Sequence, residues 1–174
     1  METRHTVVDT DLGPITLVAT RGPDGDAVSG LYFRSHRRRP GAADLGTAVP
    51  VAEDLLLGEA ATQLVDYLGG RRLAFELPLA AAGDGFQQQV WALLGLVPRG
   101  TTTTYGEIAA RLGDRSLAWQ VGQAVGANPL CVIVPCHRVV GANGSLTGYA
   151  GGLRRKQALL ALEEQDARVA GRLF

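Results

Sequence analysis

The spacing of apolar residues changes between the two halves of this chain, and this change limits the possible folds more than any other feature. Before residue 80, short apolar runs that mostly alternate with polar residues are separated by turn signals, which is typical of strands. From residue 86 the apolar residues recur every three or four positions, which is typical of amphipathic helices. The small-residue segment between them follows neither period. We therefore predict an α+β protein with domains over 1–80 and 86–174 and a linker over 81–85.

The N-terminal half is predicted to form a small sheet with one helix. Asp11, Gly13 and Pro14 mark a turn between two apolar runs, which is the pattern of a β-hairpin. Leucine and alanine recur at helical spacing before Gly69 and Gly70, which end the predicted helix. The expected elements are strands over residues 6–8, 15–20, 28–33 and 73–79 and a helix over residues 57–68.

A segment rich in Arg, Gly and Ala follows the third predicted strand. It contains Arg37, Arg38 and Arg39 directly before Pro40, and its composition predicts a mobile surface loop. The three arginines are compatible with a solvated loop and with a DNA contact, and the sequence leaves both interpretations open.

The C-terminal half opens with two predicted helices. Apolar residues form one helical face over 86–97, and Pro98 ends it. The next helix starts at Thr104, which is spaced from Glu107 as in a capping box, and it ends at Gly113.

A third helix in this half is predicted from Ser116, as its N-cap, to about Ala127, so that helix, tight turn and helix form a helix-turn-helix pattern. Its predicted buried face consists of Leu117, Val121, Ala124 and Val125. Its predicted exposed face consists of Trp119, Gly122, Gln123 and Gly126. Each internal glycine costs a helix roughly 0.8–1 kcal/mol relative to alanine. Such a face suits close approach of nucleic acid, or packing of Trp119 on another domain.

The zero net charge conceals an asymmetry between the halves. Residues 1–84 carry 8 basic and 12 acidic side chains, a net charge of −4, whereas residues 85–174 carry 9 and 5, a net charge of +4. The C-terminal half is therefore the expected polyanion contact, although a chance partition of charge would look the same.

Cys136 is the candidate for chemistry. It ends an apolar run, directly before His137 and Arg138, in a pattern that predicts a strand. In a strand, Cys131 and Cys136 would point to opposite faces, so we expect two free thiols. A Cys136 thiolate could act as a nucleophile, with His137 reached through a water, but a buried cysteine that only packs in the core is the alternative.

Three segments with consistent spacing lie around Cys136. They are Gly-Ala-Asn-Pro at 126–129, Pro-Cys-His-Arg-Val at 135–139 and Gly-Tyr-Ala-Gly-Gly at 148–152. Together they resemble the O6-alkylguanine-DNA alkyltransferase family, over at least residues 86–163. The resemblance implies an N-terminal ribonuclease-H-like domain of one small sheet and a helix, and a C-terminal helix-turn-helix domain that carries the active-site cysteine.

The resemblance also implies direct-reversal DNA repair. In that family an alkylated guanine is flipped out of the duplex and its O6-alkyl group moves irreversibly onto the cysteine, here Cys136, and O4-alkylthymine is a further expected substrate. Such a methylated-DNA–protein-cysteine methyltransferase acts once and is consumed. By resemblance, Glu163 orients His137, and His137 acts on Cys136 through water. Independently, Glu163 shares a helix face with Leu159 and Leu160, which predicts that it is interior.

Other expected site residues also come from the resemblance. Tyr105 donates a hydrogen bond to the base, Tyr149 lines the pocket, and Arg138 is placed among the DNA- or lesion-binding residues. Asn128 holds the turn before the active-site segment, although a helix C-cap before Pro129 explains it equally well.

The family places its second motif helix in the minor groove. That groove is only about 6 Å wide, so small residues at Gly122 and Gly126 would allow close approach, with contacts mostly to phosphates and sugars. The sequence departs from the family at Trp119, which occupies the position of an arginine that replaces the flipped base. We expect Trp119 to act as an apolar wedge in the stack.

Three other functions remain as alternatives. An alkyltransferase-like protein would recognise lesions with little or no transfer, a cysteine hydrolase would turn over, and a helix-turn-helix regulator would form no adduct. The N-terminal half has no cysteine, and its two histidines, His5 and His36, are too few for a tetrahedral zinc site, so no structural zinc is expected. No cofactor is expected either.

The sequence also gives expectations for localisation and for partners. No apolar run reaches the roughly 18 residues that span a bilayer, and residues 1–6 do not resemble a secretory signal, so we expect a cytoplasmic protein without a membrane partner. Its expected partner is double-stranded DNA with an alkylated guanine, bound by a monomer, and cooperative binding on DNA is left open.

Overall fold

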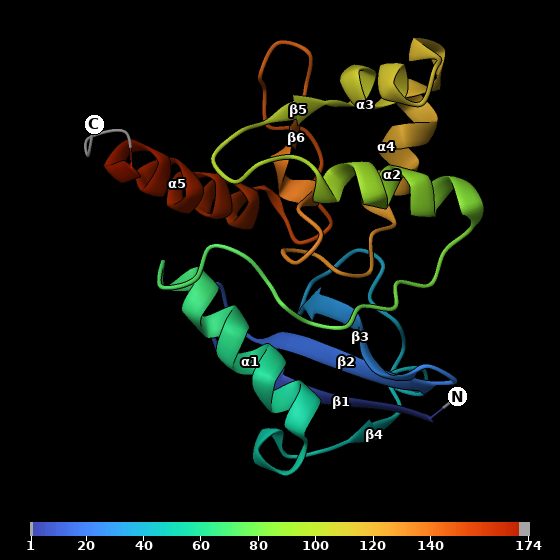
Figure 1. Ribbon diagram of the computed structural model, residues 1–174, viewed down its shortest axis with the longest axis vertical. Helices are drawn as coiled ribbons and strands as arrows, with labels where there is room; N and C mark the ends of the chain where they lie inside the picture. The colour runs from blue at the N-terminus through green and yellow to red at the C-terminus, as the bar shows by residue number, and fades with distance from the viewer. Residues whose placement is uncertain (1, 171–174) are drawn as a thin grey trace. The chain divides into compact units, whose positions relative to one another are not determined.

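A computed structural model describes residues 2–170 of the chain and the side chains up to residue 168. The chain divides into two compact units, residues 1–82 and residues 83–174, and the division lies inside the segment predicted as a linker. Small sheets combine with segregated helices, so the protein has the α+β fold that the sequence predicts (Figure 1).

The first unit is built on a four-stranded sheet. Strands β1 (Glu2–Val8), β2 (Ile15–Gly22) and β3 (Gly25–Phe33) form an antiparallel meander, and β4 (Thr47–Ala48) pairs with β1 in parallel. The strand order is β3-β2-β1-β4. The first three strands cover the residues whose alternation predicts them.

Helix α1 (Leu55–Leu68) packs on one face of this sheet (Figure 1). A short 3₁₀ turn, η1 (Val51–Glu53), precedes it, and the Asp54 side chain accepts a hydrogen bond from the Leu57 N–H as its N-cap. Apolar side chains from the helix and the sheet are fully buried between them, and each contributes about 1.5–3 kcal/mol. They include Ile15, Leu17, Leu31, Phe33, Leu57 and Leu64.

The loop after β3 covers part of the sheet rather than moving freely on its surface. His36 and Leu45 are buried, and Leu45 forms a cluster with Val18 and Tyr32. The His36 ring meets the Tyr32 ring edge to face, with 5.2 Å between centroids. The prediction of a mobile loop is therefore wrong for its two anchor residues, because apolar contacts on the second sheet face hold them. The arginines at 37–39 are exposed as predicted.

His36 makes the stability of this unit depend on pH. Burial lowers the pKa of its imidazole to about 4, and its Nδ1 has no hydrogen-bond partner among the described residues. Above pH 6.5 neither the folded nor the unfolded state carries the proton. Below pH 6.5 the unfolded state takes it up first, so stability falls until the pH reaches about 4.

We expect this effect to reach about 3 kcal/mol at low pH and about 2 kcal/mol at pH 5. The measurement is the free energy of unfolding in urea at pH 7 and pH 5 for the wild type and for His36→Phe. The wild type should lose more stability than the variant over this interval. Equal losses would show that His36 does not titrate as its burial requires.

The strand predicted over residues 73–79 does not form. This segment makes one isolated bridge, in which the Val28 N–H donates to the Pro78 carbonyl and the Ala80 N–H donates to Val28. Leu73 and Leu79 are largely exposed. Alternation alone was misleading here, because proline lacks the N–H that a ladder requires and these leucines meet no second layer.

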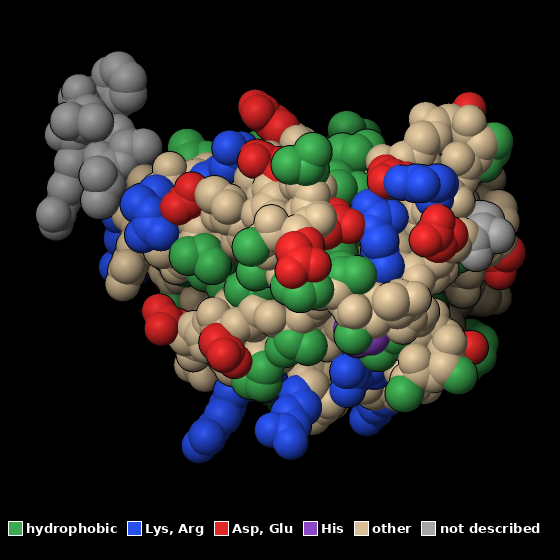
Figure 2. All heavy atoms as spheres, turned by 90° about the horizontal axis from the view of Figure 1, so that it is seen from below, with side chains coloured by type: hydrophobic (Ala, Val, Ile, Leu, Met, Phe, Trp, Pro, Cys, Tyr) green, Lys and Arg blue, Asp and Glu red, His purple; other side chains and the backbone are tan. Residues whose placement is uncertain are grey.

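Acidic and basic side chains are interspersed on the face of the molecule shown in Figure 2. In the first unit, Arg4 pairs with Asp26 and Asp54, and Arg71 pairs with Asp66. These ion pairs neutralise part of the acidic excess of the N-terminal half.

The second unit contains the predicted helix-turn-helix. Helix α2 (Gly85–Gly95) comes first, and the Trp91 indole N–H donates to the Ala124 carbonyl of α4 at 2.8 Å. Helix α3 (Tyr105–Arg111) has the predicted capping box between Thr104 and Glu107. Helix α4 (Ala118–Gly126) packs on both α2 and α3.

The N-terminal cap of the second motif helix differs from the prediction. Ser116 does not cap it, because a 3₁₀ turn, η2 (Arg115–Leu117), comes before α4. The Asp114 side chain caps that turn by accepting a hydrogen bond from the Ser116 N–H at 2.8 Å. Aspartate and serine are equally good caps, so residue type could not decide between them.

A small parallel sheet completes the second unit. Strand β5 (Thr103–Thr104) pairs with β6 (Val139–Val140), which follows the 3₁₀ turn η3 (Cys136–Arg138). Helix α5 (Leu153–Ala170) packs against η3. Among the described residues no helix is both long and apolar enough to cross a membrane.

Candidate active site

Cys136 begins the 3₁₀ turn η3 rather than ending a strand. The residues before it bend back: the Val134 N–H donates to the Leu130 carbonyl at 2.8 Å, and Val132 has a φ of 73°. Asn128 holds this bend with its side chain, which donates to the Val134 carbonyl and accepts from the Leu130 N–H, both at 2.9 Å. The prediction of a strand that ends at Cys136 is therefore wrong, because these local hydrogen bonds replace a ladder.

The bend brings the two cysteines together. Their sulfurs lie 3.6 Å apart, and Cys131 and Cys136 are 0% and 3% exposed. The prediction that they point to opposite faces is wrong, since it assumed the alternation of a strand. Both are free thiols, as predicted.

The surroundings of Cys136 favour its ionised form. A hydrogen bond from Cys131 lowers the pKa of the Cys136 thiol, and the Asn128 side chain and the Lys156 charge act in the same direction, while burial opposes them. The same contact, together with burial, raises the pKa of Cys131 well above its usual range. Cys136 is therefore the sulfur of this pair that ionises first.

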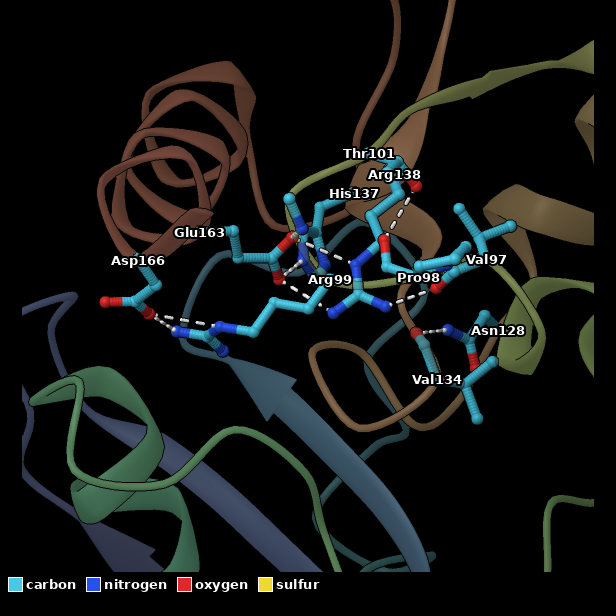
Figure 3. Close-up of polar contacts among 11 residues, drawn as sticks. Val97, Pro98, Arg99, Thr101, Asn128, Val134, His137, Arg138, Glu163 and Asp166 are labelled. Atoms are coloured by element: carbon cyan, nitrogen blue, oxygen red, sulfur yellow. Dashed lines mark hydrogen bonds and ion pairs between the residues drawn. The ribbon is translucent and has the colours of Figure 1, made fainter. Parts of the chain in front are cut away.

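His137 and Glu163 form a buried pair. The His137 Nε2 lies 2.7 Å from the Glu163 Oε1, and both side chains are completely buried (Figure 3). Burial lowers the pKa of His137, against the opposing effect of Glu163, so the ring is neutral at neutral pH. Because the carboxylate accepts a hydrogen from Nε2, Nδ1 carries the lone pair. Nδ1 is buried without a hydrogen-bond partner in the described structure, so it is available as a base.

Arg138 holds Glu163 from the other side, through a guanidinium that is nearly buried. Its Nε and Nη2 donate to the two Glu163 oxygens at 2.9 and 3.0 Å, and its Nη1 donates to the Val97 carbonyl at 2.6 Å (Figure 3). The residue is 8% exposed. The structure therefore places Arg138 behind the active site as a partner of Glu163, and not at a surface that could contact DNA.

Glu163 lies in α5, and the segment before β5 contacts it through Gly100. The Gly100 N–H donates to Glu163 Oε2 at 3.4 Å. Gly100 has a φ of 79°, and a Cβ there would lie 3.0 Å from Ala167 and 3.2 Å from the Glu163 carbonyl. Glycine is required at this position, because the backbone of the 98–102 segment passes directly against the helix.

Lys156 is a site residue that the sequence analysis missed. It is fully buried, and its ammonium donates to the carbonyls of Val139, Thr147 and Gly148 at 2.5, 2.8 and 3.1 Å. Burial lowers its pKa to about 8, and the negative charge of Cys136 opposes this effect. It is the only lysine in a chain with 17 basic residues. The use of lysine here, where every other basic residue is arginine, was the one signal in the sequence that could have pointed to Lys156.

Tyr105 and Tyr149 flank the segment that Lys156 holds. Tyr105 begins α3, and its hydroxyl donates to the Thr147 carbonyl at 3.5 Å. Tyr149 lies edge-on to the His137 ring, with 6.5 Å between centroids. Of the two expected pocket tyrosines, Tyr105 therefore contacts the 147–149 segment, and Tyr149, which belongs to that segment, contacts His137.

Helix α4 presents most of the predicted pattern of exposure, but Leu117, which was predicted on its buried face, lies in η2 and is only half-buried. Trp119 is 72% exposed and Gln123 is exposed, whereas Val121, Ala124 and Val125 are buried. A Cβ at Gly122 would lie 3.8 Å from the Tyr105 ring, and one at Gly126 would meet no described residue within 4 Å. The glycines are therefore not needed for packing within the chain, and Trp119 does not pack into the core of its unit.

Comparisons with known proteins show which family the chain resembles. Residues 85–165 match the family model described as "6-O-methylguanine DNA methyltransferase, DNA binding domain". The chain is 40% identical over 163 residues to the methylated-DNA–protein-cysteine methyltransferase of Mycobacterium bovis, covering 94% of this chain and 93% of the relative. It is 38% identical over 159 residues to the protein of that name from Methanosarcina acetivorans, covering 91% and 97%.

Solved structures give the same result. The crystal structure of Mycobacterium tuberculosis OGT in complex with DNA superposes with a TM-score of 0.81 at 40% identity, covering 93% of each chain. O6-methylguanine-DNA methyltransferase from the archaeon Pyrococcus kodakaraensis shares the fold, with a TM-score of 0.53 at 21% identity, covering 92% of this chain and 98% of that one. The chain thus belongs to the methylated-DNA–protein-cysteine methyltransferase family.

Proposed function

We propose that the protein repairs double-stranded DNA by moving the alkyl group of O6-alkylguanine, and of O4-alkylthymine, onto the sulfur of Cys136. The observation that carries this proposal is the buried thiol of lowered pKa that precedes the His137–Glu163 pair. The sulfur–carbon bond that forms is a stable thioether, so each protein molecule reacts once.

The residues around Cys136 suit this reaction. Glu163 fixes the His137 ring with Nδ1 free to accept the thiol proton, directly or through a water. The thiolate then attacks the alkyl carbon, the carbon–oxygen bond breaks, and the base leaves with its electron pair on oxygen. Tyr105 is the proposed hydrogen-bond donor to the base, which makes it a better leaving group, and Tyr149 lines the pocket.

The proposed DNA contact is the outer face of α4. Small residues at Gly122 and Gly126 allow a groove wall to approach the helix backbone closely, and M. tuberculosis OGT, a structural neighbour, was crystallised with DNA. We place α4 in the minor groove of the lesion-bearing duplex, with Trp119 inserted as a wedge where the base has left the stack. The binding unit is a monomer.

The test of this function is to map the adduct. We expect incubation with duplex DNA that contains O6-methylguanine to add one methyl group per protein molecule, on Cys136, with no further turnover. Mass spectrometry of the peptide that contains Cys136 measures the product, and Cys136→Ser is the control that should acquire none. DNA binding without an adduct would indicate a lesion-recognition protein, and product in excess of protein would indicate a hydrolase.

The wedge role of Trp119 predicts a difference between two substrates. Trp119→Ala should slow repair in duplex DNA about tenfold, because a stacking face worth about 1–3 kcal/mol is lost. Reaction with the free O6-alkylguanine base should stay at the wild-type rate, since no duplex has to be opened. Trp119→Arg should retain most duplex repair. Parallel single-turnover rates on the two substrates measure the effect, and equal losses on both would contradict the wedge.

A further inference from the structure

A second thiol lies against the acceptor thiol and forms no bond in the proposed alkyl transfer, in which it only lowers the pKa of Cys136. The Cys131 sulfur is 3.6 Å from that of Cys136. Cys131 is fully buried, while Cys136 retains 3% exposure. Two cysteines that are five residues apart in a strand would have Cα atoms about 16 Å apart. The bend at residues 130–134, with Val132 at a φ of 73°, is what brings the sulfurs into contact.

We propose that Cys131 is a resolving thiol, which forms a disulfide with Cys136 when a peroxide oxidises the acceptor, and so keeps that oxidation reversible. This inference rests on the proposed function, because it uses the same nucleophilic sulfur of Cys136. It assigns to Cys131 a role toward peroxides that alkyl transfer does not require.

The geometry allows the disulfide to form. The sulfurs must approach by about 1.5 Å to reach a bond length near 2.05 Å. Residues 131–135 belong to no helix or strand, so side-chain rotation and a small backbone shift would break no ladder. Cys136 also lies at the start of a 3₁₀ turn, and its partner lies in the bend just before it. The movement is therefore local.

The chemistry proceeds in two balanced steps. The Cys136 thiolate attacks one oxygen of hydrogen peroxide, a sulfur–oxygen bond forms, the oxygen–oxygen bond breaks, and hydroxide leaves, which gives a sulfenic acid. The Cys131 thiol then loses its proton and attacks the Cys136 sulfur. The sulfur–sulfur bond forms, the sulfur–oxygen bond breaks, and the hydroxyl group leaves as water. In total, two thiols give two electrons to one peroxide, with two waters as products.

Charge sets the order of these steps. The pKa of Cys136 is lowered and that of Cys131 is raised, so Cys136 reacts first while Cys131 keeps its proton. Oxidation to the sulfenic acid removes the negative charge beside Cys131. The part of the raised pKa of Cys131 that came from the Cys136 thiolate is then lost, although burial still raises it, so Cys131 gives up its proton more readily and can attack.

The experiment treats the reduced full-length protein with hydrogen peroxide and follows one tryptic peptide. Ser116–Arg138 contains both cysteines and no internal Lys or Arg. In the wild type we expect this peptide to lose the mass of two hydrogens, and dithiothreitol should restore both the mass and methyl transfer. In Cys131→Ala we expect Cys136 to gain oxygens instead. Recovered transfer, as a fraction of each variant's own activity before peroxide, should be roughly tenfold higher in the wild type.

Two controls separate this inference from the proposed function. Cys131→Ser keeps a polar group of similar size but cannot form the bond, so it should behave as Cys131→Ala does. Wild type that has first been methylated on Cys136 by lesion DNA should form no disulfide, since its sulfur is already a thioether. Wild type that transfers methyl groups but gains oxygens on Cys136 without a disulfide overturns the resolving role alone. Reduced wild type that accepts no methyl group overturns the proposed function.

Discussion

Glu163→Gln is expected to lose both stability and activity, although it replaces a side chain with one of the same size. The Glu163 carboxylate accepts hydrogen bonds from the His137 ring and from two nitrogens of Arg138. All three side chains are buried from water. A carboxamide offers one accepting oxygen and turns an N–H toward the other donors. The Arg138 charge is then buried without its partner, which costs about 3–5 kcal/mol.

The effect of Glu163→Gln on alkyl transfer follows from His137. Without the carboxylate, the ring is no longer held with its Nδ1 lone pair free, and loss of an oriented general base typically slows a reaction about 100-fold or more. Single-turnover transfer rates, measured at a temperature where circular dichroism shows the variant to be folded, test this. A variant with the wild-type rate would remove His137 and Glu163 from the mechanism.

Glu164→Gln is the matched control. The Glu164 carboxylate is exposed, and it pairs with Arg168, which lies one turn further along α5. Pairs of this kind contribute about 0.3–0.5 kcal/mol. The control should therefore change the free energy of unfolding by less than about 0.5 kcal/mol, and its transfer rate should match the wild type.

Lys156→Met is the second substitution with a large expected effect. It leaves three carbonyls in the 139–148 region without the donor that holds them, at a cost of about 1–3 kcal/mol. Two of these carbonyls, at Thr147 and Gly148, lie directly before Tyr149. The variant should therefore loosen the segment that carries this pocket tyrosine and contacts Tyr105.

Lys156 also acts on the acceptor thiol through its charge. Its removal should raise the pKa of Cys136, because the ammonium favours the thiolate. We expect transfer at pH 7 to fall about tenfold and the rate to recover in part as the pH rises, since each pKa unit changes the thiolate fraction tenfold. The rate profile from pH 6 to pH 9 measures this. Arg154→Met, an exposed cation two residues earlier in α5, should leave the profile unchanged. A Lys156→Met profile that matches the wild type would show that the lysine is only structural.

The helices of the second unit could be predicted from sequence because local rules govern them. The capping box at Thr104 and Glu107 forms as its spacing indicates, and α4 buries Val121, Ala124 and Val125 as helical periodicity predicts. Glu163 is interior because it follows Leu159 and Leu160 at helical spacing, and it is indeed fully buried, whereas Glu164 is exposed. Each of these predictions depends on residues within about one or two turns.

The predictions that failed depended on contacts between distant residues or on a choice between two local patterns. The 73–79 segment alternates like a strand, but it pairs with β3 only through the single bridge at Leu79, because Pro78 has no N–H that could extend a ladder. The run before Cys136 is apolar like a strand, but Asn128 satisfies its backbone groups in a bend. Arg138 and Lys156 resemble surface cations in sequence, and only their partners show that they are buried.

By itself the sequence determined the helices of the second unit, because their faces and caps follow from residue type and short-range spacing, and its resemblance to a known family indicated the chemistry. The tertiary structure alone decided which groups are in contact. Arg138 donates to Glu163, Lys156 lies buried where its charge favours the Cys136 thiolate, and the two thiols touch. The physical reason is that these contacts join residues through bends and packing, and their hydrogen bonds and charges act over a few ångströms of space rather than along the chain.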